Sequence, residues 1–189
     1  ATREDILEPP MIRELKLLQN KVKGIPFQTA LEVIEASLGK KINEVFSHID
    51  EIAIGTASIG VVYKAELLNG EKVVVKVRRP GIAKTINTDF EILLFIIKRL
   101  EKSSSDIRFL GMSKMINDFF FFSQNELNFQ VEAQNCERLK KNLSVIDKEG
   151  FLVVPNVYRE FTTQEVIVLE FMDGRPFNEF HSLEQLGPV

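Results

Sequence analysis

The sequence predicts an α+β fold in which an antiparallel sheet of about five strands is combined with amphipathic helices. Three segments, at about 50–54, 60–67 and 72–78, are rich in apolar and β-branched residues and are bounded by turn residues, as strands are. Two later apolar segments, 152–155 and 166–171, are expected to extend the same sheet. Elsewhere, apolar residues recur at the spacing of a helix.

Helical patterns dominate the first part of the chain. Residues 1–23 carry a helical pattern that ends before Pro26, and a second amphipathic helix is expected at about 29–38, with Gly39 as its stop. We interpret residues 1–49 as a helical extension that precedes the sheet.

The turn between the first two strand segments is built from small residues. Gly55, Ala57, Gly60 and Val62 stand where the protein-kinase nucleotide loop G-x-G-x-x-G-x-V has Gly, Gly, Gly and Val. A backbone that covers a triphosphate must approach it closely and offer N–H donors, which favours residues without large side chains. Small-residue turns are also common in ordinary hairpins, so the loop alone is weak evidence for a nucleotide site. The loop and Lys76, which follows at the spacing found in kinases, together favour such a site.

Lys76 lies on the third strand segment, which is entered through a tight turn. Asn69-Gly70 predicts a two-residue hairpin, because both positions tolerate positive φ. Within 72–78 the valines at odd positions share one face and Lys76 lies on the other. Two interpretations of Lys76 remain open: a cation that binds phosphate oxygens, or an ordinary solvated strand lysine.

Two helices are expected after this strand, at about 86–102 and 107–122. The second contains four consecutive phenylalanines, Phe119 to Phe122, which point to all sides of a helix. Such a tetrad suggests either burial or a partner surface, and it indicates a core more often than a site for a lipid or quinone.

The next helical segment, at about 124–142, places a carboxylate in an apolar stripe formed by Phe129, Ala133, Cys136, Leu139 and Leu143. Glu132 projects into the middle of that stripe. Burying a carboxylate alone is costly, so Glu132 needs a partner, and Lys76 is the obvious candidate. The alternative is a Glu132 side chain that bends out to water.

The last strand segment ends where a kinase would contact adenine. By its place in the order of elements, Leu169 would line the back of a nucleotide pocket. The carbonyl of Glu170 and the backbone of Met172 would then bond the adenine, with a turn at Asp173-Gly174.

Composition limits the classes of function. The net charge is −3 with both signs interspersed, which argues against nucleic acid as a partner. Cys136 is the only cysteine, which excludes an intrachain disulfide and a cysteine-based metal site. The two histidines, His48 and His181, show no ligand-like spacing, and the apolar run from Ile92 to Ile97 is too short for a membrane span.

Four stretches of the sequence together resemble the UbiB, or aarF-domain (ADCK), family of atypical kinases. They are Thr2 to Leu7 with Glu14 to Gln19, Ala57 to Ala65, Val75 to Gly81, and Glu126 to Asn128 with Glu132 to Asn135. The A-S-I-x-x-V-Y loop and the K-V-x-R-P-G run are more specific than a general kinase loop, and the resemblance covers nearly the whole chain.

The resemblance implies a helical extension at residues 1–49 and a kinase-like small lobe at residues 50–174. The small lobe would contain inserted helices at about 86–122. It implies binding of ATP or ADP with Mg²⁺, a link to ubiquinone or other prenyl-lipid metabolism, and a prenyl-lipid, quinone or membrane surface as a further candidate partner. Mitochondrial, plastid or bacterial cytoplasmic locations are each compatible with it.

By the resemblance, Lys76 contacts phosphate, Glu132 is its partner on the αC-like helix, Glu126 opens the E-x-D motif, and Glu170 and Met172 bound the adenine slot. The nucleotide loop would comprise Ile54, Gly55, Thr56, Ala57, Ser58, Ile59, Gly60, Val61 and Val62.

This sequence departs from the family pattern at several positions. Gly55 and Thr56 stand where the family usually has alanine, Val61 replaces a glutamine, and Asn128 replaces the second acid of E-x-D, which puts the partner of that acid in doubt. Ala57 replaces a kinase glycine, which should alter nucleotide affinity or selectivity.

The resemblance places the K-x-G-Q motif before the first residue and the H-x-D and D-F-G loops after Gly174. We therefore expect residues 175–189 to begin a large lobe that this chain does not complete. No catalytic residue or metal ligand is expected in the chain itself. The favoured function is an ATP-binding small lobe of an atypical kinase or ATPase. The alternative is a non-catalytic, pseudokinase-like module that binds a lipid, quinone or protein partner.

Overall fold

A computed structural model describes residues 24–103, 105 and 109–174, and its architecture confirms the α+β prediction. The helix expected within residues 1–23, the last segment at 175–189 and His181 lie outside the described residues.

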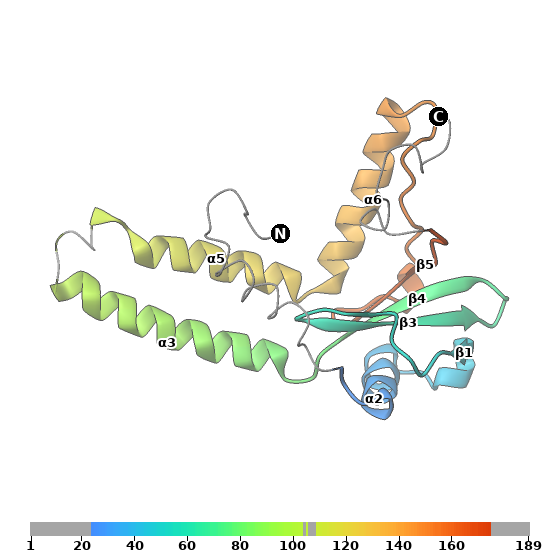
Figure 1. The fold of residues 1–189 in the computed structure, drawn as a ribbon, viewed down its shortest axis with the longest axis horizontal. Helices are drawn as coiled ribbons and strands as arrows, with labels where there is room; N and C mark the ends of the chain where they lie inside the picture. The colour runs from blue at the N-terminus through green and yellow to red at the C-terminus, as the bar shows by residue number, and fades with distance from the viewer. Residues whose placement is uncertain (1–23, 104, 106–108, 175–189) are drawn as a thin grey trace, which may run out of the picture.

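The centre of the molecule is an antiparallel sheet of five strands in the order β1-β3-β4-β5, with the short β2 paired to β3 (Figure 1). The strands are β1 (Phe46–Ile49), β2 (Gly55–Thr56), β3 (Gly60–Leu67), β4 (Lys72–Arg78) and β5 (Val166–Glu170). Each strand is hydrogen-bonded to its neighbour in antiparallel register, so the edge-to-edge order places β4 between β3 and β5.

The two faces of the sheet differ in burial. Alternate residues of β3 and β4 are buried, as the period of two in the sequence predicts. Helix α2 (Phe27–Leu38) covers the buried face with Ala30 and Ile34, and Gly39 ends it in the left-handed conformation. The helical extension therefore packs on one face and leaves the face that carries Lys76 for other elements.

The hairpin between β3 and β4 is a three-residue loop rather than the predicted two-residue turn. Glu66 pairs with Lys72, and Leu67 receives a bond from the Gly70 N–H while its own N–H donates to the Glu71 carbonyl. Gly70 has a φ of 85°, and among the described residues only glycines have positive φ. This is the type I turn with a left-handed glycine that hairpins of this length adopt.

Two strand predictions were wrong. The first strand lies at Phe46–Ile49, not 50–54, because the apolar residues that reach the core are Phe46 and Ile49, whereas Glu51 and Ile52 are exposed. Residues 152–155 form no strand. There the Asp147 carboxylate accepts the Leu152 N–H, and pairing to β5 is limited to one bridge from Val157 to Leu169. The short helix η2 (Arg159–Phe161) lies between Val157 and β5 in the sequence. Another short helix, η1 (Ile42–Glu44), precedes β1.

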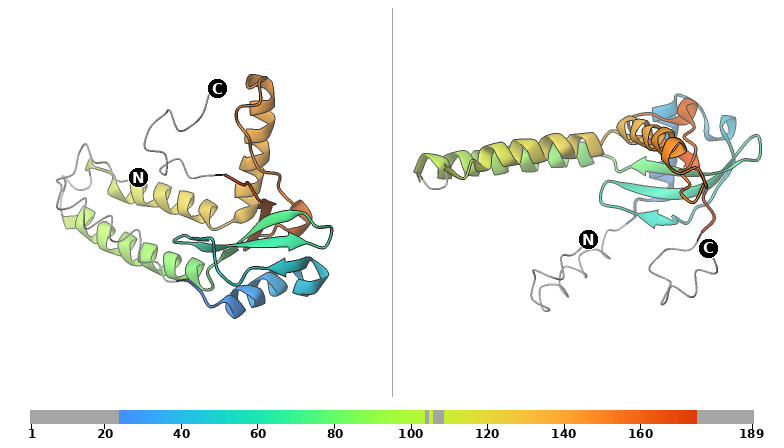
Figure 2. Two further views of the ribbon diagram at one scale, coloured as in Figure 1. Left: turned by 45° about the vertical axis from the view of Figure 1, so that its right-hand side comes forward. Right: turned by 90° about the horizontal axis from the view of Figure 1, so that it is seen from above.

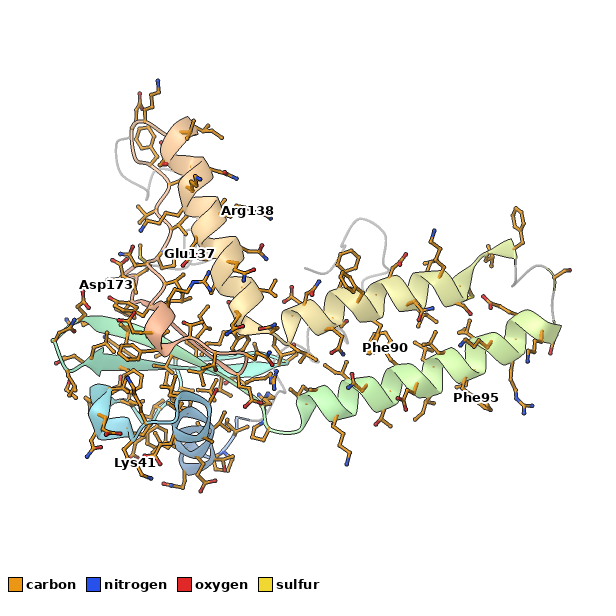
Figure 3. The ribbon with its side chains drawn as sticks, turned by 180° about the vertical axis from the view of Figure 1, so that it is seen from behind. Lys41, Phe90, Phe95, Glu137, Arg138 and Asp173 are labelled. Atoms are coloured by element: carbon orange, nitrogen blue, oxygen red, sulfur yellow. The ribbon has the colours of Figure 1, made fainter. Side chains whose placement is uncertain are left out.

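Helices α3 (Ile82–Ser103) and α5 (Met112–Glu126) form an antiparallel arm that projects from the sheet (Figures 1 and 2). Phe90 lies between the two helices, with its ring centroid 4.8 Å from that of Phe120 (Figure 3). The arm corresponds to the two predicted helices, but each helix differs from its prediction at both ends.

The phenylalanine tetrad is not buried among the described residues, which contradicts the first of our two interpretations, burial in a core. Phe119, Phe121 and Phe122 are 64%, 64% and 65% exposed. Phe120 packs into the arm against Phe90, and the Phe119 ring touches Phe90 with a centroid distance of 5.6 Å. A two-helix arm has one inner face, so a run of four large residues cannot all be covered by it.

Helix α6 (Phe129–Ile146) follows α5 after a break of two residues and rises from the sheet on the side opposite α2 (Figure 1). Our prediction had placed one continuous helix at 124–142. The first turns of α6 pack on the sheet through Phe129 and Ala133, whereas Leu139, farther along the predicted apolar stripe, is exposed.

Candidate functional site

The centre of the candidate site is an ion pair between β4 and α6. The Lys76 ammonium donates to both carboxylate oxygens of Glu132, at 2.9 and 2.7 Å from Nζ to Oε1 and Oε2. The Lys76 side chain is 21% exposed and that of Glu132 is 39% exposed. Lys76 is therefore not an ordinary solvated strand lysine, and Glu132 does not bend away to water.

The face of an aromatic ring contacts the lysine of this pair. Phe129, the first residue of α6, is fully buried, and Lys76 Nζ lies 4.7 Å from the centroid of its ring. Phe129 forms a second small core with Ala133 and with Ile167 of β5. Because Ile167 is the cross-strand partner of Lys76, the packing of α6 on β5 brings Glu132 to the lysine.

A pocket of about 440 Å³ opens beside the ion pair. Its lining includes Lys76, Glu132 and Glu126, together with residues of α5 and α6: Phe122, Asn125, Val131 and Asn135. The structure thus brings three predicted site residues into one depression, with one cation and two carboxylates. Such a mixed set can hold a phosphorylated ligand through the lysine while the Glu132 carboxylate fixes the lysine's position.

Asn128, which the sequence places at the second acid of the E-x-D motif, does not line this pocket. It is the N-cap of α6, and its Oδ1 accepts the backbone N–H of Gln130 at 3.0 Å. This cap is also the reason that α5 ends at Glu126 instead of continuing into α6, because Asn favours the non-helical N-cap conformation.

Replacing Asn128 with alanine is expected to lower the free energy of unfolding by about 1 kcal/mol, because the α6 cap is lost. Asn128→Asp keeps the acceptor oxygen and adds a charge that the helix N-terminus favours, so it should be neutral or slightly stabilising. Urea unfolding of the three proteins measures both changes. Equal destabilisation by Ala and Asp would contradict the capping role.

The small-residue loop lies next to Lys76. Val62, in β3, is the direct cross-strand partner of Lys76. The loop itself is a tight turn in which the Ala57 N–H donates to the Gly60 carbonyl at 2.8 Å, while Gly55 and Thr56 pair with Val62 and Val61. Ile59 packs toward Phe129. The exposed residues of the predicted loop are Ile54, Thr56, Ala57 and Ser58.

The end of β5 lies farther along the same sheet. Leu169 joins the core around Phe129, opposite Val74 of β4. The Glu170 N–H donates to the Asn156 carbonyl. Our prediction of an adenine contact concerns the other backbone group of this residue, the Glu170 carbonyl, together with the backbone of Met172. Met172 follows the strand and is exposed at its edge.

Sequence reasoning missed two arginines that support the site. Arg79 donates its backbone N–H to the Ile59 carbonyl and its Nε to the Ala57 carbonyl, which fastens the loop to the end of β4. Arg78 ion-pairs with Glu165 and donates to the Leu127 carbonyl. Strand alternation places Arg78 on the same face as Lys76, which was the one available signal.

Cys136 lies on the same helix as Glu132, and its thiol faces the Pro155 carbonyl. Burial raises the pKa of this thiol, and the charges of Glu132 and Glu137 raise it further. The group therefore stays protonated near neutral pH, which disfavours a role as a nucleophile.

Within residues 24–103, 105 and 109–174, no three His, Cys, Asp or Glu side chains gather as ligands for a metal ion. Across that described part, no helix has both the length and the apolar character needed to cross a bilayer.

Comparisons with known proteins concern the family and the fold of this chain. A family model described as the ABC1 atypical kinase-like domain matches residues 17–188. Similar sequences include the probable protein kinase UbiB of Marinobacter nauticus, 34% identical over 187 residues, and that of Pseudomonas putida strain F1, 37% identical over 183 residues. These alignments cover 99% and 97% of this chain but 34% and 33% of the relatives, so the chain spans about a third of their length.

A solved structure shares the fold. The complex of Rv3197 with erythromycin from Mycobacterium tuberculosis superposes with a TM-score of 0.72 at 22% sequence identity. The match covers 96% of this chain and 46% of that one. The shared fold therefore takes in almost all of this chain and about half of that structure.

Proposed function

This chain belongs to the ABC1 atypical kinase-like family, and from that premise we propose that it forms the ATP-binding small lobe of an atypical kinase or ATPase. The observation that carries the proposal is the contact of Lys76 with both carboxylate oxygens of Glu132, beside the small-residue loop. In kinases, such a pair holds a lysine on the phosphates of the nucleotide.

The groups present are suited to an adenine nucleotide. Lys76 supplies a fixed positive charge at one end of the sheet face, and Val62 and Val74 give that face an apolar surface. Glu132 limits the freedom of the ammonium, so less entropy is lost when phosphate oxygens bind it. Bound Mg²⁺ would neutralise phosphate charge, but the described residues do not form a metal site, and we derive no step through it.

Replacing Lys76 with methionine is expected to weaken ATP binding about ten- to a hundredfold, because a hydrogen bond to a charged group is lost. Methionine keeps the length of the side chain and removes its charge. Lys72→Met is the matched control, because Lys72 lies on the same strand but is exposed at its far end. Isothermal titration with ATP and ADP, with and without Mg²⁺, measures the affinities.

The two variants separate specific from general effects. Retention of affinity in Lys72→Met with its loss in Lys76→Met supports the nucleotide site. Equal affinities in Lys76→Met and the unaltered chain would contradict the role of the lysine.

The exposed phenylalanines of α5 favour a second candidate function, in which the chain binds a prenyl-lipid or quinone without catalysis. Phe119, Phe121 and Phe122 present apolar rings to solvent, and Phe122 also lines the pocket beside Lys76. Vesicles containing a prenylated quinone should sediment with the chain, and the triple substitution of these phenylalanines by serine should release it. Binding that is unchanged by the triple substitution would contradict this alternative.

A further inference from the structure

Arg78 lies two residues after Lys76 on β4, and its side chain contacts two groups that belong neither to the small-residue loop nor to the ion pair. Its side chain is 16% exposed. One guanidinium nitrogen, Nη1, donates to the Leu127 carbonyl at 2.6 Å, and Nη2 pairs with the Glu165 carboxylate. A strand residue thus reaches two segments that are distant in the sequence.

The first contact is at the junction of α5 and α6. Leu127 is buried, follows the last residue of α5 and precedes the N-cap of α6. The last carbonyl groups of a helix lack helical partners and carry the negative end of its dipole. Arg78 supplies both a donor and a positive charge to this end.

The second contact is with the turn that leads into β5. The Arg78 backbone N–H donates to the Glu165 carbonyl at 2.8 Å, in addition to the side-chain pair. In the same turn, the Gln164 carbonyl accepts the N–H of Phe129, the first residue of α6. The turn at residues 164–165 therefore binds both the start of α6, through Phe129, and the end of β4, through Arg78.

Glu132 lies less than one helical turn beyond Phe129. Its distance from Lys76 therefore depends on where the α5–α6 junction is held. We propose that Arg78 is a positioning residue: it holds this junction where Glu132 reaches Lys76, and it links the α3–α5 arm to the lysine. The inference rests on the proposed function, because the position of Lys76 matters for activity if the lysine contacts phosphate.

The direct test measures Lys76 itself without nucleotide. An ammonium group held by a carboxylate reacts slowly with acylating reagents, so acetylation of Lys76 by an N-hydroxysuccinimide ester reports on the pair. Mass spectrometry gives the rate at Lys76 relative to the exposed Lys72 of the same strand. Glu132→Gln sets the rate for a lysine without its partner.

Arg78→Gln is expected to raise the relative rate at Lys76 several-fold, and Arg78→Lys less. The double variant with Glu132→Gln should be no faster than Glu132→Gln alone, because Arg78 acts through that carboxylate. Arg159→Gln is the matched control: it removes another arginine–carboxylate pair on α6, with Glu137, and should leave the rate unchanged.

Two results would overturn the proposal: an unchanged rate in Arg78→Gln, or an equal increase in Arg159→Gln. Circular dichroism checks that each variant is folded. If Arg78→Gln unfolds, Arg78→Lys and Glu165→Gln decide the question, since Glu165 is half exposed and its loss should give a smaller rise. Unchanged rates in both would also overturn it.

Nucleotide titration separates this proposal from the proposed function. If the unaltered chain binds ATP, Arg78→Gln should weaken binding while Arg159→Gln does not. If the unaltered chain binds no nucleotide, the proposed function fails, whereas the acetylation rates still establish or refute the positioning of Lys76.

Discussion

Replacing Phe129 with alanine is expected to lower the free energy of unfolding by about 3–5 kcal/mol. Its ring is fully buried in the core that joins α6 to β5. Removing the ring loses its apolar contacts and leaves a cavity that β-sheet neighbours such as Ile167 cannot fill. The cost is at the upper end for single substitutions. Chemical denaturation with urea measures it.

The matched control is Phe151→Ala, which removes the same ring from an exposed position. Phe151 is 66% exposed, so the change in stability should stay within about 0.5 kcal/mol. A small effect at Phe129 would show that α6 does not depend on this contact.

The same substitution should also affect the site. The Phe129 ring contacts the Lys76 ammonium and packs α6 against Ile167 of β5. Phe129→Ala should therefore increase acetylation of Lys76 under conditions where the variant is still folded. The core residue and the site residue are thus parts of one arrangement.

The sequence was sufficient for the strands β3, β4 and β5 and for the central pair of the site. The alternation of valines in β4 predicted which face is buried, and the helical position of Glu132 predicted that it points toward the sheet. Both are strictly local patterns with a fixed geometric period. Gly39 likewise marked the end of α2, because the left-handed conformation there favours glycine.

The sequence was not sufficient where contacts between distant segments decide the structure. The break between α5 and α6 depends on the Asn128 cap and on Arg78, which lies almost fifty residues earlier in the chain. Burial of the phenylalanine tetrad would require a layer outside α5, and a local pattern does not say whether one exists. The first strand was misplaced because Phe46 and Ile49 alternate irregularly across a register shift.

The described elements cover the two faces of the sheet unequally. Helix α2 covers the valine face, whereas the first turns of α6 pack on the opposite face. Lys76, Val62 and Val74 remain half-buried on that face. The relatives extend well beyond this chain, which spans about a third of their length.

Gly60→Ala is expected to destabilise the chain by about 1–3 kcal/mol, as overpacking does. A Cβ at Gly60 would lie 2.8 Å from the Val77 carbonyl oxygen and 3.4 Å from the Phe129 ring. The first of these neighbours is backbone in the β3–β4 ladder, so it can yield only if the strands shift. This requirement for glycine comes from strand packing and holds whether or not phosphate binds.

Gly55→Ala separates this explanation from a phosphate-binding one. At Gly55 the nearest atom to an added Cβ is the Val62 side chain at 3.7 Å, an ordinary contact, so stability should change little. Gly60→Ala should lower the urea midpoint in the absence of nucleotide, whereas Gly55→Ala should not. If Gly60→Ala left the midpoint unchanged and lost only ATP affinity, the glycine would serve the ligand and not the fold, and the loop would have to be understood as a phosphate-binding element first.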